Sequence, residues 1–333
     1  MRPEFATHNS RRGRLGAGAL MIGVPASVAA VVMAGQALAA PAPAQPVPAP
    51  APAAPQIQPQ SRRITYGHEV VVRGFASPAD AGDTVVLEFA PRGENVWSQL
   101  GSTTVGATGA FRLASRLERS GTVQVVDTSS GSLTPFLASG NGGASAATSN
   151  RVSVDVAARL RVPSHGIAIL AGQALQVRGR LLPALHGRKV TLQALQSGSW
   201  HTLATARTGS AGRFALRYVA GGPGGQTIRV RFAGDRRNGR SEAVAGQMTV
   251  FRAAEASWYN DGGNTACGFH AGYGVANRTL PCGTKVEFRY GGRSVTATVD
   301  DRGPYVGGRD WDLNQTTAGA LGFGGVGLVW SSQ

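Results

Sequence analysis

The sequence has little of several features that most chains of this size contain. Aromatic residues make up only 7% of the 333 residues, cysteine occurs twice, and 18 acidic residues face 33 lysines and arginines. Long stretches with the three-to-four-residue apolar spacing of an amphipathic helix are scarce, which argues against a helical protein. Short runs of Val, Thr and Leu, separated by turns and accompanied by 47 glycines, instead predict an all-β chain.

The two cysteines, Cys267 and Cys282, lie close together near the C-terminus. In an exported protein such a pair predicts one disulfide, with two buried free thiols as the alternative. A metal site would need more ligands than the nearby His270 supplies. No metal and no cofactor are therefore expected.

The net charge of +15 is unevenly distributed. From Glu255 onward the chain has six basic and seven acidic residues, so the basic excess lies before that point. A basic front part suits anionic wall polymers or lipid headgroups, although compositional drift accounts for the arginines equally well. Nucleic acid is not expected, because the chain looks exported and lacks a basic-aromatic binding motif.

The first 40 residues have the form of an export signal. Arginines precede an apolar run from Leu15 to about Ala39, which ends in small residues typical of a cleavage site. An uncleaved membrane anchor is the alternative, and membrane contact is expected only through this segment. Residues 41–62 are rich in Pro and Ala, which alternate over much of this segment, and predict an extended spacer. We therefore expect a secreted or cell-envelope protein.

Two segments in the middle of the chain resemble each other at an offset of 103–105 residues. The matches include Gly67 to Gly74 with Gly172 to Gly179, and Gly109 to Leu113 with Gly212 to Leu216. Each segment consists of short alternating strands separated by turns, which predicts two immunoglobulin-like β-sandwich repeats at 63–157 and 158–252. A rigid stalk and a binding module are the two functions open to them.

Five short motifs follow one another in the last part of the chain. In one-letter code they are A-S-W-Y from Ala256, T-A-C-G from Thr265, R-T-L-P-C-G-T-K-V from Arg278, V-D-D-R-G-P-Y from Val299 and R-D-W-D-L from Arg309. In this order and spacing they resemble the RlpA-like (rare lipoprotein A) double-psi β-barrel family, which is related to the barrels of expansins. The resemblance covers 253–333 and implies a six-stranded barrel that binds or cleaves peptidoglycan glycan strands.

The residues of this segment also predict its local structure. Strands are expected at 285–290 and 294–299, and a short helix at 315–321 that Gly322 stops. Asp301 follows the second strand at a turn, and Asp312 comes from another strand end ahead of the helix. The two carboxylates are expected to face one cleft and to raise each other's pKa, so that one can protonate a glycosidic oxygen.

A wider set of residues is expected to bind glycan around these carboxylates: Tyr259, His270, Asn277, Arg302, Tyr305 and Trp311. Packing is the alternative for each aromatic residue, and for Trp258 it is the favoured one. Arg302 is equally well placed to form an ion pair with Asp301. Asp300 and Asp310 are expected to be solvated charges at strand ends.

Two positions depart from the family pattern. Active members usually have a Glu just after the T-A-x-G segment and a His before R-T-L-P, where this chain has Phe269 and Asn277. Loss of a proton-transferring group lowers a rate by about 10²–10⁴-fold. We therefore expect the barrel to bind wall glycan in an expansin-like or weakly catalytic way. The alternatives are a lytic transglycosylase with Asp301 as acid and base, and a non-catalytic scaffold that binds a protein partner.

Overall fold

The structure is a computed structural model, and it describes residues 53–128, 146–260 and 262–333. The expected signal segment and most of the expected spacer lie outside these ranges. Within them the chain is all-β, as predicted, with one α-helix and two single-turn 3₁₀ helices, η1 (Pro78–Asp80) and η2 (Ser210–Gly212). None of the helices in the described ranges combines the length and the apolar character that a membrane crossing requires.

The described end of the expected spacer differs from the prediction. Gln56–Pro59 form strand β1, which pairs antiparallel with β3 (Glu69–Phe75). Ile57 alternates with two glutamines and is buried in the core, and Pro59 is tolerated because β1 lies at a sheet edge. The first folded unit therefore begins before residue 63.

The first folded unit consists of two sheets that share one core. One sheet has the order β1-β3-β6, and the other has the order β2-β8-β7-β4-β5. The further strands are β2 (Arg63–Thr65), β4 (Thr84–Pro91), β5 (Ser98–Thr104), β6 (Ala110–Arg116), β7 (Gly121–Asp127) and β8 (Val152–Ala157). Alternate residues of facing strands, such as Val72 of β3 and Leu87 of β4, meet in that core.

The second folded unit repeats this arrangement. One sheet has the order β14-β11-β9, and the other runs β13-β12-β15-β16 with β10 added parallel to β16, as β2 is to β8. The strands are β9 (Arg159–Arg161), β10 (Ile167–Leu170), β11 (Ala174–Leu182), β12 (Lys189–Gln196), β13 (Ser199–Arg207), β14 (Arg213–Val219), β15 (Gly224–Phe232) and β16 (Ser241–Tyr259). In both units a strand glycine, Gly74 or Gly179, leaves room for a phenylalanine ring, Phe111 or Phe214, that any Cβ would strike. This contact explains the matched glycine and phenylalanine motifs of the two segments.

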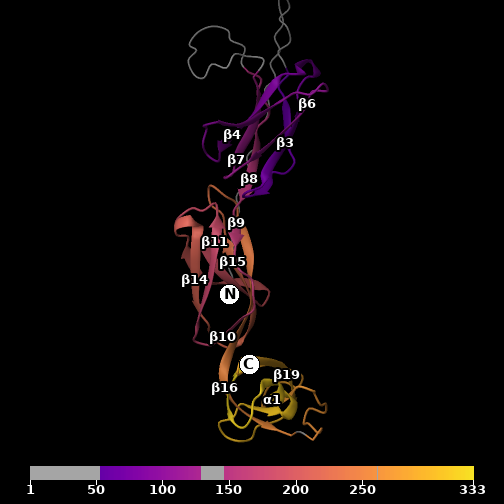
Figure 1. The fold of residues 1–333 in the computed structure, drawn as a ribbon, viewed down its shortest axis with the longest axis vertical. Coiled ribbons are helices and arrows are strands. Elements are labelled where there is room, and N and C mark those ends of the chain that lie inside the picture. The colour runs from indigo at the N-terminus through magenta and orange to yellow at the C-terminus, as the bar shows by residue number, and fades with distance from the viewer. Residues whose placement is uncertain (1–52, 129–145, 261) are drawn as a thin grey trace, which may run out of the picture. The chain divides into compact units, whose positions relative to one another are not determined.

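The C-terminal unit is a sheet closed on itself. Strand β16 pairs with β15 as far as Val250, then with β21 (Gly327–Ser331) from Arg252 and with β20 (Trp311–Asn314) from Ala256. With β17 (Gly274–Ala276), β18 (Lys285–Tyr290) and β19 (Arg293–Asp301), the order is β16-β20-β17-β19-β18-β21, and β21 returns to β16. This barrel is the orange-to-yellow part of Figure 1.

The barrel encloses its own core, and α1 (Gln315–Leu321) packs against it. The edge of the Phe288 ring meets the Trp311 ring at a centroid distance of 5.1 Å, and both side chains are fully buried. Asn314 caps α1 by accepting from the Thr317 amide, and Gly322 ends it in the left-handed conformation at φ 66°. The predictions of two strands near 285–299 and of the helix at 315–321 are confirmed.

Candidate functional site

Four strands bring the predicted carboxylates into one row on the barrel. Ala276 of β17 is paired with Asp301 of β19 on one side and with Asp312 of β20 on the other, and Asp312 is paired with Ser257 of β16. Paired residues of neighbouring strands project to the same face, and strands lie about 4.8 Å apart. The Cα atoms of Asp301 and Asp312 are therefore about 10 Å apart, with the methyl group of Ala276 between them.

A bulge in β19 places Asp301 in this row. The pairing of β17 with β19 passes from Val275–Val299 directly to Ala276–Asp301, so Asp300 has no partner across the ladder. Bulges of this kind redirect the following side chain. Val299 points into the core, whereas Asp301 emerges half-exposed beside Ala276.

Three hydrogen bonds hold the Asp301 carboxylate. Its Oδ1 accepts from the backbone amides of Ala266 and Arg302, each at 2.8 Å, and its Oδ2 accepts from the Tyr259 hydroxyl at 2.9 Å. Tyr259, which was predicted to bind glycan, therefore also holds the Asp301 carboxylate in position. The tyrosine hydroxyl can also accept a hydrogen bond. The contact can therefore persist, with its direction reversed, when Oδ2 carries a proton.

Asp312 has a different environment. Its Oδ1 accepts from the buried Ser257 hydroxyl at 2.7 Å, and the same Ser257 oxygen accepts from Arg309 at 3.1 Å. The Ser257 hydroxyl thus bridges the Arg309 guanidinium and the Asp312 carboxylate. Ser257 and Arg309 belong to the site by geometry, although the sequence motifs that contain them did not single them out.

Asp300 is not the solvated charge that was expected. It is fully buried, and it accepts hydrogen bonds from the amides of Ala271 at 2.8 Å and Val275 at 3.1 Å. Burial raises its pKa above the usual 3.8, against the lowering effect of these two amides and of the positive charge of His270. Asp300 therefore fixes the loop that precedes β17. Asp310 is also engaged, in an ion pair with Arg252 at 3.2 Å.

The predicted disulfide is present and ties this loop to the following turn. Cys267 and Cys282 are joined, with their Cα atoms 5.8 Å apart. Across the turn, the Arg302 guanidinium donates to the carbonyl oxygens of Asn277 and Leu280 at 3.0 and 2.9 Å and to the Cys282 sulfur at 2.9 Å. The guanidinium is thus used within the protein, and it is the Arg302 backbone amide that contacts Asp301.

Two more predicted ligand residues occupy distinct environments. Asn277 is nearly buried: its Oδ1 accepts from the amides of Thr279 and Leu280, and its Nδ2 donates to the Asp310 carbonyl. His270 is exposed on the loop that Asp300 holds. The described residues contain no group of three or more His, Cys, Asp or Glu side chains able to hold a metal ion.

The predicted aromatic ligands separate into exposed and buried groups. Tyr305 is 83% exposed directly after the Asp301 turn, and Trp258, which was expected to pack, is 43% exposed. Trp311 is fully buried against Phe288, so its prediction as a glycan-binding residue is wrong. The alternation Trp-Asp-Leu-Asn in β20 already indicates that Trp311 is buried, because Trp311 lies on the same face of the strand as the buried Leu313.

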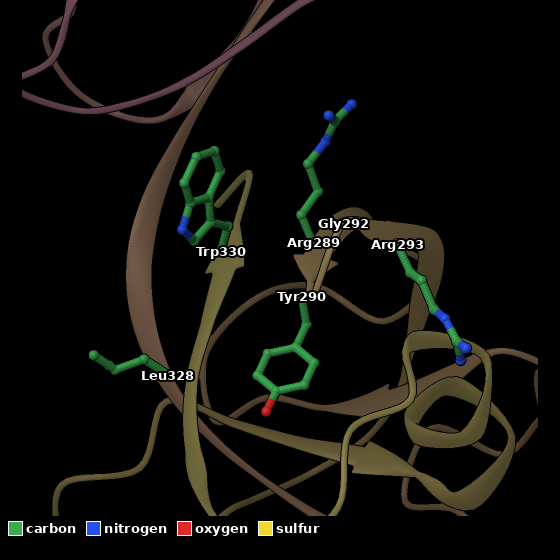
Figure 2. Close-up of a pocket in the computed structure, with 7 residues that line it drawn as sticks. Arg289, Tyr290, Gly292, Arg293, Leu328 and Trp330 are labelled. Carbon is green, nitrogen blue, oxygen red and sulfur yellow. The ribbon is translucent and has the colours of Figure 1, made fainter.

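A separate hollow lies at the other end of β19. It has a volume of about 330 Å³ and is lined by Arg289, Tyr290, Gly291, Gly292, Arg293, Leu328 and Trp330. Figure 2 shows Leu328 and Trp330 on one strand and Arg289 and Tyr290 on its neighbour. The nine residues of β19 extend about 26 Å at about 3.3 Å per step. This hollow is therefore remote from Asp301, and no predicted site residue lines it.

Comparison with known sequences finds matches to the barrel region of the chain. The model of a double-psi β-barrel family described as "Lytic transglycolase" matches residues 252–330. Two relatives, both named "Probable endolytic peptidoglycan transglycosylase RlpA", are 42% identical to this chain. The Synechocystis protein matches over 96 residues, 26% of this chain and 30% of its own length. The Aquifex aeolicus protein matches over 82 residues, 22% of this chain and 36% of its own length. The chain thus spans about a third of the length of these relatives.

Solved structures also resemble the chain, at low identity. The D0–D1 domains of intimin match with a TM-score of 0.20 and 14% identity, covering 59% of this chain and 94% of that one. A chimeric titin Z1Z2–Z1Z2 tandem matches with a TM-score of 0.24 and 16% identity, covering 59% and 98%. The sequence matches, by contrast, fall on the closed sheet and its row of carboxylates. The C-terminal part of the chain, residues 252–330, is an RlpA-like double-psi β-barrel.

Proposed function

We propose that the barrel binds peptidoglycan glycan strands across the row formed by Ser257, Asp312, Ala276 and Asp301. The observation that carries this proposal is the pair of half-exposed carboxylates on either side of one small side chain. Carboxylates accept hydrogen bonds from sugar hydroxyl groups, and the exposed ring of Tyr305 can stack on a sugar ring. The relatives named as peptidoglycan transglycosylases support the choice of glycan.

In this proposal the barrel binds in an expansin-like manner and cleaves slowly or not at all. The family's Glu and His are replaced by Phe269 and Asn277, and Asn277 uses both ends of its amide inside the protein. A carboxylate separation of about 5–5.5 Å suits a retaining glycosidase and about 6.5–9.5 Å an inverting one. The Cα spacing of about 10 Å does not fix the separation of the two carboxylates, so the low activity in this proposal rests on Phe269 and Asn277.

The second candidate is lytic transglycosylation, which the names of the relatives favour. A protonated Asp301 would give its proton to the glycosidic oxygen as the bond from that oxygen to the muramic acid C1 breaks. The muramic acid's own hydroxyl would then form the new bond to C1 and return its proton to Asp301. One carboxyl group suffices, and the Tyr259 hydroxyl at Oδ2 would exchange its donor role for an acceptor role in step with Asp301.

The deciding experiment incubates the purified chain with peptidoglycan, measures how much protein pellets, and searches for anhydro-muropeptides by mass spectrometry. We expect the protein to pellet with the wall, Asp301→Ala/Asp312→Ala to lose this binding, and anhydro products to be absent or scarce. Abundant anhydro products that disappear in Asp301→Ala would establish the second candidate. Failure to pellet would exclude both and leave a scaffold that binds a protein partner.

The remaining architecture is part of the same proposal. Residues 63–157, together with β1 (Gln56–Pro59), and residues 158–252 are two repeats of one immunoglobulin-like unit, their equivalence supported by matching strand orders. Residues 253–333 are the six-stranded barrel of the family. We propose that a signal or anchor in 1–40 and the spacer that follows place these units in the cell envelope. Anionic wall polymers are a further proposed partner, bound by the basic part of the chain before Glu255. Nucleic acid is not among the proposed partners.

A further inference from the structure

The basic excess of the chain is concentrated in one of the two sandwiches. Residues 158–252 contain fifteen lysines and arginines and two acidic residues, whereas 63–157 contain seven and eight. The two units have the same strand order, so the fold does not require this difference. Both acidic residues of the second unit are already engaged, Asp235 with Arg188 at 2.9 Å and Glu242 with Arg229 at 2.7 Å.

Six of these arginines share the outward face of the β14-β11-β9 sheet, which we call the arginine face. Each alternates with inward residues along its strand and is exposed: Arg159, Arg161, Arg178, Arg180, Arg213 and Arg217. The three strands contain no Asp or Glu. None of the ion pairs among the described residues involves any of the six.

The register of the sheet sets three of these charges side by side. Arg180 of β11 is paired with Arg161 of β9 on one side and with Arg213 of β14 on the other. Directly opposite residues have Cβ atoms about 4.5–5.5 Å apart, and like charges at that distance destabilise a sheet. Without an anion over it, this row lowers the stability of the unit that carries it.

The first sandwich shows how the same face is arranged when charge is balanced. On its β1-β3-β6 sheet Arg73 is paired with Arg112, but Arg116 is paired with Glu69, and the two form an ion pair at 3.6 Å. The arginine face has no such carboxylate. Arg178 and Arg180 donate to neutral acceptors, the Gln176 side chain and the Ala211 carbonyl oxygen, so the positive charge of the face is left for an external anion.

We propose that the arginine face binds a linear polyanionic wall polysaccharide, with a phosphate or carboxylate in each repeat. The charges recur across strands at about 4.8 Å and along strands at about 6.6 Å, which matches a polymer of closely spaced anions better than one isolated anion. Guanidinium groups bind phosphate and carboxylate through paired hydrogen bonds. The choice of a wall polymer rests on the proposed envelope location, whereas the anionic chemistry rests on the sheet alone.

The test measures binding of the purified full chain to polygalacturonate and to inorganic polyphosphate at several salt concentrations, with neutral dextran as a blank. Arg161→Gln/Arg180→Gln/Arg213→Gln should reduce the magnitude of the negative slope of log affinity against log salt by about 2, at about 0.7 per charge neutralised on a single-stranded polyanion. The matched control is Arg73→Gln/Arg112→Gln/Arg116→Gln, which removes three charges from the equivalent face of the first sandwich and should leave the slope unchanged.

Equal losses in both triple variants would show that only total charge matters and would overturn the proposal, as would full binding by the first variant. The three arginines replaced by lysine keep the charge and should keep most of the binding, provided that the melting temperature shows each variant folded. Tighter binding to phosphatidylglycerol vesicles or to single-stranded DNA than to either polymer would overturn the choice of occupant. Asp301→Ala should bind these polyanions normally, so failure of glycan binding at the barrel and failure here are separable.

Discussion

Breaking the disulfide between Cys267 and Cys282 should destabilise the barrel and leave the first sandwich unchanged. The bond closes a loop across 15 positions, and the loop-closure entropy of a loop of this length corresponds to about 3 kcal/mol. In a domain of roughly 80 residues each kcal/mol shifts the melting temperature by about 4–8 °C. The barrel transition should therefore fall by about 12–24 °C. Both cysteines of the chain lie in the barrel, so the first sandwich is an internal control.

Differential scanning calorimetry of the oxidised chain, the reduced chain and Cys267→Ser/Cys282→Ser measures this shift. The reduced chain and the double variant should agree, because each lacks the same crosslink. The disulfide also holds the loop whose Ala266 amide donates to Asp301, so pelleting with peptidoglycan should weaken together with stability. A barrel transition that moves by less than about 4 °C, or a first-sandwich transition that moves equally, would refute the reasoning.

Three further predictions concern the barrel. Gly274→Ala should destabilise it by about 1–3 kcal/mol in urea unfolding, because the added Cβ would strike the buried Asp300 carboxylate, whereas Gly272→Ala, with open space around it, should be neutral. Burial raises the pKa of Asp300 above 3.8. The contribution of Asp300 to stability is therefore full below pH 3.8 and is lost as the pH rises through the folded-state pKa. Unfolding free energies measured over a pH series should show this fall, and Asp300→Asn should flatten the pH dependence. Tyr305→Ala should reduce pelleting with peptidoglycan while the melting temperature stays unchanged, because this ring is exposed; unchanged pelleting would remove Tyr305 from the binding face.

Local sequence signals predicted the elements of the barrel well. The expected helix at 315–321 matches α1 residue for residue, because Gly322 provides a stop signal of known conformation. The strand expected at 285–290 is β18, and β19 extends the one expected at 294–299 by one residue at its start and two at its end. Composition does not predict where the Pro/Ala spacer ends, because the pairing of β1 with β3 is a tertiary contact.

The candidate site was predicted less completely, for identifiable reasons. The bulge that buries Asp300 and exposes Asp301 depends on the partner strand, and the dipeptide Asp-Asp does not reveal which carboxylate turns inward. The bonds from the Arg302 guanidinium to the 277–282 turn likewise need three-dimensional proximity. Trp311 is different, because the period of two in its strand already indicated burial.

Strand β16 belongs to two folding units at once. Its pairing with β15 ends at Val250 and its pairing with β21 begins at Arg252, and the residue between them, Phe251, is fully buried and contacts Trp330. Ordering a backbone residue costs about 1–2 kcal/mol of conformational entropy, and here one ordered strand serves both units. The folding equilibria of the second sandwich and the barrel are thereby linked: a glycan that tightens the barrel should slow hydrogen exchange of the β15–β16 amides, where it makes no contact.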